Sequence, residues 1–237
     1  MFPGLFTNIT DFDSPLVRNI KGIRASQSLF DDLTDNKEEH DLAAKVADQD
    51  YISTTSPLIT RPFDYGTVIT YPYIPQNWQA TRFSSGLRYG VWYGSIAIET
   101  TVYETAYHWQ RFVTDSFANY DNLISADRRV FNVNCRGILI DLQEKSTEFP
   151  DLLNPESYLF TNQVGEYLFM QRQNGLFVKS ARCDGVNAAV FNADLLSDVK
   201  DVCYLTYEFN PSQNTEILVK RDSKKVWMKI SKFSSHT

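Results

Sequence analysis

The stretch Thr81–His108, TRFSSGLRYGVWYGSIAIETTVYETAYH, contains the elements around which the fold is expected to form. It opens with a short polar run containing Gly86 and passes into an aromatic strand over residues 89–93. A turn is predicted at Gly94-Ser95, because glycine and serine favour turns. A helix should follow directly. The stretch therefore predicts a loop–strand–helix unit.

The helix is predicted from its periodicity, with Ser95 as its N-cap. Its apolar side chains recur at the helical period, so that they form one stripe; they are Ile98, Val102, Thr105, Ala106, Trp109, Phe112 and Val113. At about 100° per residue, Glu104 lies well over 90° from the centre of that stripe. A plain solvent-facing glutamate is therefore one interpretation of Glu104. Glu99 lies nearer the stripe and is the rival carboxylate.

Arg82, Tyr93 and Glu104 follow one another at equal steps along the chain, one on each element of the unit. A guanidinium, an aromatic ring and a carboxylate in one place could hold an anionic nucleotide and cleave a glycosidic bond. Spacing alone does not decide this, because any tyrosine-rich globular chain offers such triples.

The composition favours a single globular domain with a large sheet. The chain has 237 residues, of which 43% are hydrophobic, 22% charged and 14% aromatic. Aromatic residues favour strands, so an α+β fold is expected. We interpret residues 1–237 as one domain, with residues 1–75 as an N-terminal extension that is helical and rich in proline and aromatic residues. Residues 76–200 are the expected catalytic core.

Within the extension, Pro3, Gly4, Pro15 and Gly22 are expected to interrupt any long element over residues 1–30. A helix is predicted near residues 35–48, followed by a Pro- and aromatic-rich stretch over residues 49–80 that wraps the core, with one short strand at Thr67 to Tyr71.

Downstream, residues 114–135 are predicted to be loop. A helix is expected from Asn154 to Arg172, ended by Asn174-Gly175. The predicted strands are residues 137–142, 176–180, 187–191, 203–209 and 216–220.

Several function classes are disfavoured. The net charge of −6 argues against a phosphate-tracking surface for nucleic acid. The three cysteines form no CxxC pair, which gives neither a disulfide framework nor a zinc site and suits a reducing compartment. Signal-peptide and membrane-spanning patterns are missing from the sequence, so no membrane role and a cytoplasmic location are expected.

Metal chemistry is also poorly supported. His108 follows Glu104 by one helical turn, but no third ligand is evident, so a surface pair is the better interpretation and no metal is expected. The common nucleotide, hydrolase and metalloprotease motifs, such as GxGxxG, GxxxxGK[ST], GxSxG and HExxH, do not occur.

Four segments carry a family resemblance. They are Arg82-Phe83 with the glycine that follows, WYGS at 92–95, ETA at 104–106, and LFVKSAR at 176–182 followed by DGVNAAVF at 184–191. In their order and intervals these segments resemble the RES-domain family, the toxin partner of RES–Xre type bacterial toxin–antitoxin systems. The similarity covers residues 20–195.

The resemblance implies a fold like that of the ADP-ribosyltransferases, with a mixed split-sheet core, and NAD as substrate in place of a bound cofactor. It maps the catalytic residues of the family onto Arg82, Tyr93, Glu104 and Ser180. Arg82 would bind a phosphate or ribose oxygen, Tyr93 would stack on nicotinamide, and Ser180 would hold the nicotinamide ribose or amide. Arg182, and also Arg88, are expected as secondary phosphate contacts.

The expected function is an NAD+ phosphorylase or glycohydrolase in which Glu104 stabilises positive charge on the ribose. Protein ADP-ribosylation is the alternative reaction, and a non-catalytic interaction module that uses residues 49–80 is the alternative class. By family analogy the partner would be a helix-turn-helix, Xre-like antitoxin, with no direct contact between this chain and nucleic acid.

Overall fold

The computed structural model describes residues 2–22, 66–118, 120–213, 216–222 and 225–233. The helix predicted near residues 35–48, and residues 49–65 of the Pro- and aromatic-rich stretch, lie outside the described residues. None of the helices in these ranges has the length and apolar character that a membrane span requires.

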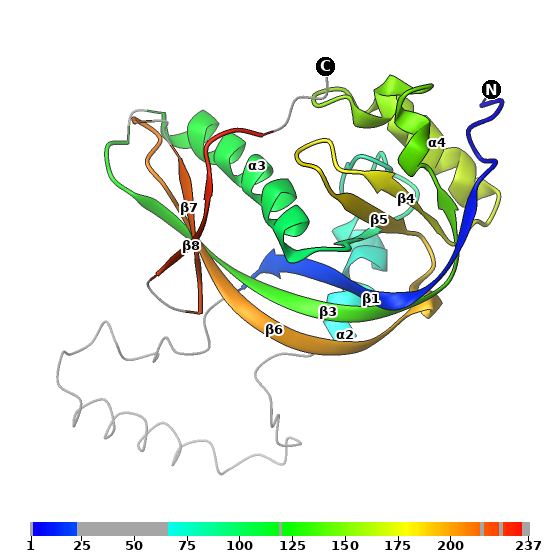
Figure 1. Cartoon of the computed structure of the whole chain (residues 1–237), viewed down its shortest axis with the longest axis horizontal. Coiled ribbons are helices and arrows are strands. Elements are labelled where there is room, and N and C mark those ends of the chain that lie inside the picture. The colour runs from blue at the N-terminus through cyan, green and yellow to red at the C-terminus, as the bar shows by residue number, and fades with distance from the viewer. Residues whose placement is uncertain (1, 23–65, 119, 214–215, 223–224, 234–237) are drawn as a thin grey trace, which may run out of the picture.

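Eight strands form one mixed sheet, which confirms the α+β class (Figure 1). Their hydrogen-bonded order is β1-β2-β5-β4-β3-β6-β7-β8, and β1 also pairs with β3, so β1, β2, β5, β4 and β3 form a closed ring. The β3–β4 pair is parallel and the other pairs are antiparallel. The strands are β1 Ile9–Lys21, β2 Trp92–Ser95, β3 Ile124–Asp141, β4 Gly175–Lys179, β5 Val186–Val190, β6 Leu196–Phe209, β7 Ile217–Arg221 and β8 Val226–Ile230.

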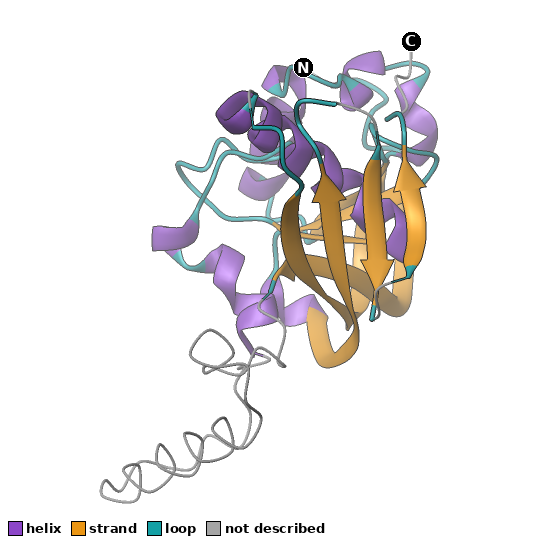
Figure 2. Ribbon diagram, turned by 90° about the vertical axis from the view of Figure 1, so that its left-hand side faces the viewer, coloured by secondary structure: helices purple, strands orange, loops and turns teal. Residues whose placement is uncertain are grey.

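The described α-helices are α2 Gly66–Thr70, α3 Ile98–Phe117 and α4 Leu159–Met170. Figures 1 and 2 show α3 and α4 on the same side of the long, curved strands β3 and β6. The apolar face of α3 is buried with side chains of β6 and β7, among them Val102 and Ala106 of the helix and Leu205 of β6. Burial of this stripe fixes the rotation of α3 about its axis.

A second core lies under α4. Val164 and Leu168 of the helix are buried with Leu176 and Val178 of β4. The loop before β2 joins this cluster through Phe83, which is 1% exposed. Because Phe83 follows Arg82 directly, packing in this core also anchors the predicted arginine.

The N-terminal prediction was wrong in one respect: residues 9–21 form the unbroken strand β1, which contains Pro15. Pro15 lies opposite Asn134 of β3, while β2 reaches β1 only at Val17. At Pro15 the second edge of β1 is therefore open. Proline within a sheet is tolerated at such an open edge.

Further predictions were also wrong. Residues 66–70 form the helix α2, where a strand was expected. Of residues 114–135, all predicted as loop, residues 114–117 belong to α3 and residues 124–135 to β3, whose polar side chains alternate with buried ones such as Val130 and Val133. Gly94 and Ser95 lie within β2, paired with Ala188 and Asn187 of β5, and Ala97 is the N-cap of α3. In each case pairing in the sheet, or packing on it, outweighed local preference.

Candidate active site

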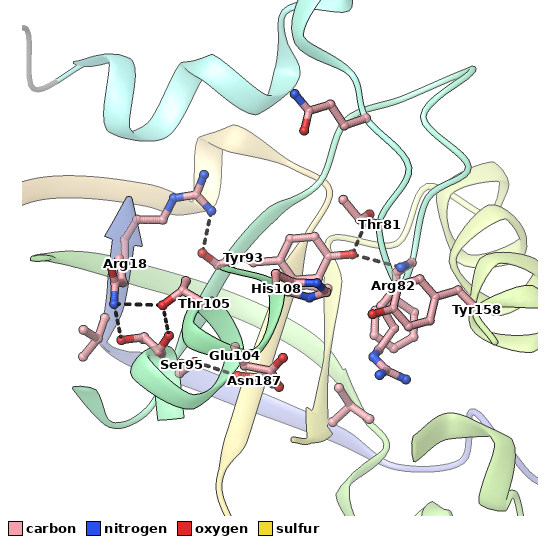
Figure 3. A pocket seen from close by; sticks show the side chains of 18 of the residues that line it. Arg18, Thr81, Arg82, Tyr93, Ser95, Glu104, Thr105, His108, Tyr158 and Asn187 are labelled. Carbon is pink, nitrogen blue, oxygen red and sulfur yellow. Dashed lines mark hydrogen bonds between the residues drawn. The ribbon is translucent and has the colours of Figure 1, made fainter. Parts of the chain in front are cut away.

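A cavity of about 440 Å³ opens where β1, β2, β5 and α3 meet the loop before β2 (Figure 3). This volume is typical of small-molecule sites. Its walls carry both polar and aromatic side chains. They include Arg18, Asn19, Thr81, Arg82, Tyr93, Ser95, Thr101, Glu104, Thr105, His108, Tyr158 and Asn187.

Glu104 lines this cavity, and one of its carboxylate oxygens is held by two donors. Oε1 accepts hydrogen bonds from Ser180 Oγ at 2.6 Å and from Asn187 Nδ2 at 2.6 Å. Ser180 Oγ itself accepts the backbone N–H groups of Arg182 and Cys183, so its own proton is directed to Glu104. Within the described residues no hydrogen bond reaches Oε2. That oxygen is free to meet a ligand.

The structure separates the two rival carboxylates. Glu99 is exposed in the first turn of α3 and does not line the cavity. Glu104 lies off the apolar stripe, as the periodicity predicts, yet β5 and the residue after β4 cover that side of the helix. A position that would face water on an isolated helix therefore faces a polar cavity.

Arg82 also lines the cavity, from the loop before β2. Its Nη1 donates to the carbonyl oxygens of Leu152 at 3.2 Å and Asn154 at 3.0 Å. Its guanidinium lies over the ring of Tyr158, 4.6 Å from the centroid. Burial lowers the pKa of Arg82. Arginine carries five N–H donors, and the two on Nη1 are the ones used here by the described residues, which leaves the rest for an anionic ligand.

Tyr93, on β2, is hydrogen-bonded to the loop before β2 that carries Arg82, which we call the arginine loop. Its hydroxyl donates to Thr81 Oγ1 at 2.9 Å and accepts the backbone N–H of Phe83 at 2.9 Å. Burial raises the pKa of Tyr93 to about 12, so the phenol is neutral at physiological pH. The ring face lines the cavity between Arg82 and Glu104 (Figure 3).

Replacing Tyr93 by phenylalanine is expected to lower the free energy of unfolding by about 1–3 kcal/mol, because it leaves the backbone N–H of Phe83 without its acceptor. Urea unfolding followed by tryptophan fluorescence measures this change. Tyr71→Phe is the control, since Tyr71 is 51% exposed. Equal midpoints for the Tyr93 variant and the parent would contradict the structural role of the hydroxyl.

The parent protein is also expected to lose stability in alkali. The raised pKa of Tyr93 means that folding favours its neutral form. Its contribution is complete below pH 10, the ordinary value for tyrosine, and is lost as the pH rises through about 12. Tyr93→Phe should therefore show a smaller loss than the parent over this interval. Urea midpoints measured from pH 8 upward test the difference.

The other predicted residues lie outside the cavity walls. Ser180 is fully buried behind Glu104. Arg182 is buried as well; its guanidinium lies 3.4 Å from the Tyr107 ring centroid, and Nη2 donates to Pro155 O at 2.6 Å. Arg88 is exposed and pairs with Glu166 at 2.6 Å. The structure thus brings Arg82, Tyr93 and Glu104 into one pocket, with Ser180 supporting the carboxylate.

Several cavity residues were missed by the sequence analysis, and Arg18 and Asn187 are two of them. Arg18 comes from β1, within the predicted extension; its Nη1 donates to Tyr93 O at 2.6 Å, and burial lowers its pKa to about 10. No sequence pattern connects residue 18 with residue 93. Asn187 lies inside the segment DGVNAAVF, and its place opposite Ser95 follows only from the β2–β5 register.

His108 also lines the cavity, one turn after Glu104, and burial lowers its pKa. Across the described ranges no three histidine, cysteine, aspartate or glutamate side chains gather in a metal-binding arrangement.

A family model described as the RES domain matches residues 58–210, which is more than half of the chain. Among solved structures, the crystal structure of the M. tuberculosis MbcT–MbcA toxin–antitoxin complex is similar, with 10% sequence identity and a TM-score of 0.45 over 86% of this chain and 88% of that chain. The comparison with curated proteins gives no match. By the match over residues 58–210, the chain belongs to the RES domain family.

Proposed function

We propose that this protein is an NAD-degrading toxin that cleaves the nicotinamide–ribose bond by phosphorolysis or hydrolysis. Membership of the RES domain family supports, at the level of the family, a toxin and enzyme that acts on NAD. The observation that carries the proposal is the Glu104 carboxylate, held at Oε1 and open at Oε2, in one cavity with Arg82 and Tyr93.

Cleavage breaks the bond between the ribose C1 atom and the nicotinamide nitrogen. The electron pair leaves with nicotinamide, which becomes neutral, and positive charge develops on the sugar. A carboxylate already held beside the ribose stabilises that charge as it develops in the transition state. Water or phosphate then attacks C1 and gives up a proton. We assign the stabilising role to Glu104 Oε2.

The remaining residues would bind the substrate. The free N–H donors of Arg82 suit a phosphate or ribose oxygen, and the Tyr93 ring offers a face for nicotinamide. Ser180, fully buried behind the carboxylate, would act on the substrate through Glu104. Arg182 lies beyond the walls, so a contact with phosphate would need a rearrangement of its bond to Pro155.

A protein that consumes NAD in its own cell needs a partner that blocks it. We propose an Xre-like helix-turn-helix antitoxin that covers the cavity and binds DNA through its own domain. The net charge of −6 does not favour direct contact of this chain with DNA. Action on cellular NAD also implies a cytoplasmic location.

The test is incubation of the purified protein with NAD, with and without phosphate, followed by chromatography. Phosphorolysis should give nicotinamide and ADP-ribose-1″-phosphate, hydrolysis should give ADP-ribose, and transfer should label an added protein. Intact NAD in every condition, together with an unchanged melting temperature on NAD addition, would overturn the proposal and favour an interaction module.

A further inference from the structure

Glu104 is connected to a second strand residue through Asn187. Ser95 Oγ donates to Asn187 Oδ1 at 2.6 Å, and Asn187 Nδ2 donates to Glu104 Oε1 at 2.6 Å. Ser95 and Asn187 are direct partners in the antiparallel β2–β5 ladder. Directly opposed side chains in such a pair lie close enough to bond. The register of two strands therefore builds the connection (Figure 3).

The amide of Asn187 is oriented from both ends. Its NH2 group faces the Glu104 carboxylate, and the Ser95 hydroxyl supports that orientation by donating to the carbonyl oxygen Oδ1. The opposite orientation would place Oδ1 against an ionised carboxylate, which only accepts hydrogen bonds. Ser95 is 3% exposed, so little water competes for this bond.

We infer that Asn187 is a positioning residue for the reaction proposed above, and that Ser95 holds its amide in place. The inference rests on the proposed function. With Asn187 and Ser180 both donating to Oε1, the carboxylate is fixed in rotation and Oε2 is presented to the ribose. Loss of the Asn187 donor leaves Glu104 in the cavity with Ser180 as the one remaining donor to Oε1 among the described residues, so the carboxylate is less firmly fixed. This should affect the charged transition state more than substrate binding.

Steady-state kinetics of NAD cleavage in Asn187→Ala, Ser95→Ala and the double variant test the inference. Asn187→Ala is expected to lower kcat by roughly 10–10²-fold, the usual loss when a partner of a working group is removed. KM should change little. Ser95→Ala should lower kcat by a smaller factor. In a protein that already carries Asn187→Ala it should not lower kcat further, because the hydroxyl acts through the amide.

Asn187→Asp distinguishes the effect of the hydrogen bond that the Asn187 amide donates from the effect of the space that its side chain fills. It preserves the shape of the side chain, but it removes the donor and adds a like charge beside Glu104. Its kcat should fall at least as far as that of Asn187→Ala. Asn134→Ala is the matched control, since this half-buried strand asparagine bonds Asp198 outside the cavity. It should retain the parental kcat.

The inference would be overturned if the factors by which Ser95→Ala and Asn187→Ala lower kcat multiplied in the double variant. It would also be overturned if Asn187→Asp had the parental kcat. A double-mutant cycle of urea midpoints with Asn187→Ala and Glu104→Ala, which removes the acceptor, reports the hydrogen bond without any need for NAD turnover. Coupled midpoints in a parent protein that leaves NAD intact would mean that the proposed reaction has failed while the bond is real. Additive midpoints would mean that the bond itself is absent.

Discussion

Glu104→Gln is expected to lower the rate of nicotinamide release from NAD by about 10²–10⁴-fold, in line with the loss of a working carboxylate. Glutamine has the size of glutamate, and its oxygen can still accept the hydrogen bonds from Ser180 and Asn187. The group presented to the ribose would then be an uncharged NH2. It gives no stabilisation to positive charge on the sugar. Single-turnover release of nicotinamide measures the effect.

Glu99→Gln is the matched control, because it makes the same chemical change on the same helix at an exposed position outside the cavity. Its rate should equal that of the parent. Thermal melting of both variants checks that the chain remains folded. A Glu104→Gln protein that cleaves NAD at the parental rate would remove Glu104 from the mechanism, and a slow Glu99→Gln protein would move the role to Glu99.

Gly165→Ala is expected to reduce the free energy of unfolding by about 1–3 kcal/mol, the usual cost of overpacking. An added Cβ would lie 2.0 Å from Phe83 O, so the helix α4 and the arginine loop cannot both stay in place. Alanine is the better helix former by about 1 kcal/mol, which offsets part of this cost. Urea unfolding measures the net change.

The same variant should also weaken substrate binding. Phe83 O belongs to the residue after Arg82, and a displaced loop moves the guanidinium away from Glu104 and Tyr93. We expect a raised KM for NAD. Gln163→Ala, at an exposed position of α4, is the control and should stay within about 0.5 kcal/mol of the parent. Parental stability in Gly165→Ala would show that helix and loop are not in close contact.

Elements with a strong local signal were predicted well. The apolar period from residue 98 to 113 lies within α3, and the predicted strands at 176–180 and 187–191 correspond to β4 and β5. In each case the spacing of apolar residues predicts which side chains are buried, and burial of those side chains stabilises the element.

Elements stabilised mainly by pairing with a distant strand were predicted poorly. β1 contains Pro15 and β3 contains a run of charged side chains, so both look irregular in sequence. They pair with each other along thirteen residue positions, from Ile9–Ile140 to Lys21–Arg128. Hydrogen bonds to a distant strand stabilise them, and such long-range pairing leaves little local signal.

The sequence by itself determined the residue types of the candidate site, the helix that carries Glu104, and the order of the RES-domain motifs. Only the tertiary structure decided that Glu104 faces a cavity, because the cover over that side of α3 comes from Ser180 and Asn187, which lie far along the chain. It also decided that Arg18 joins the cavity wall. Helical periodicity is a property of neighbouring residues, whereas the surroundings of a side chain depend on strand pairing across the whole domain.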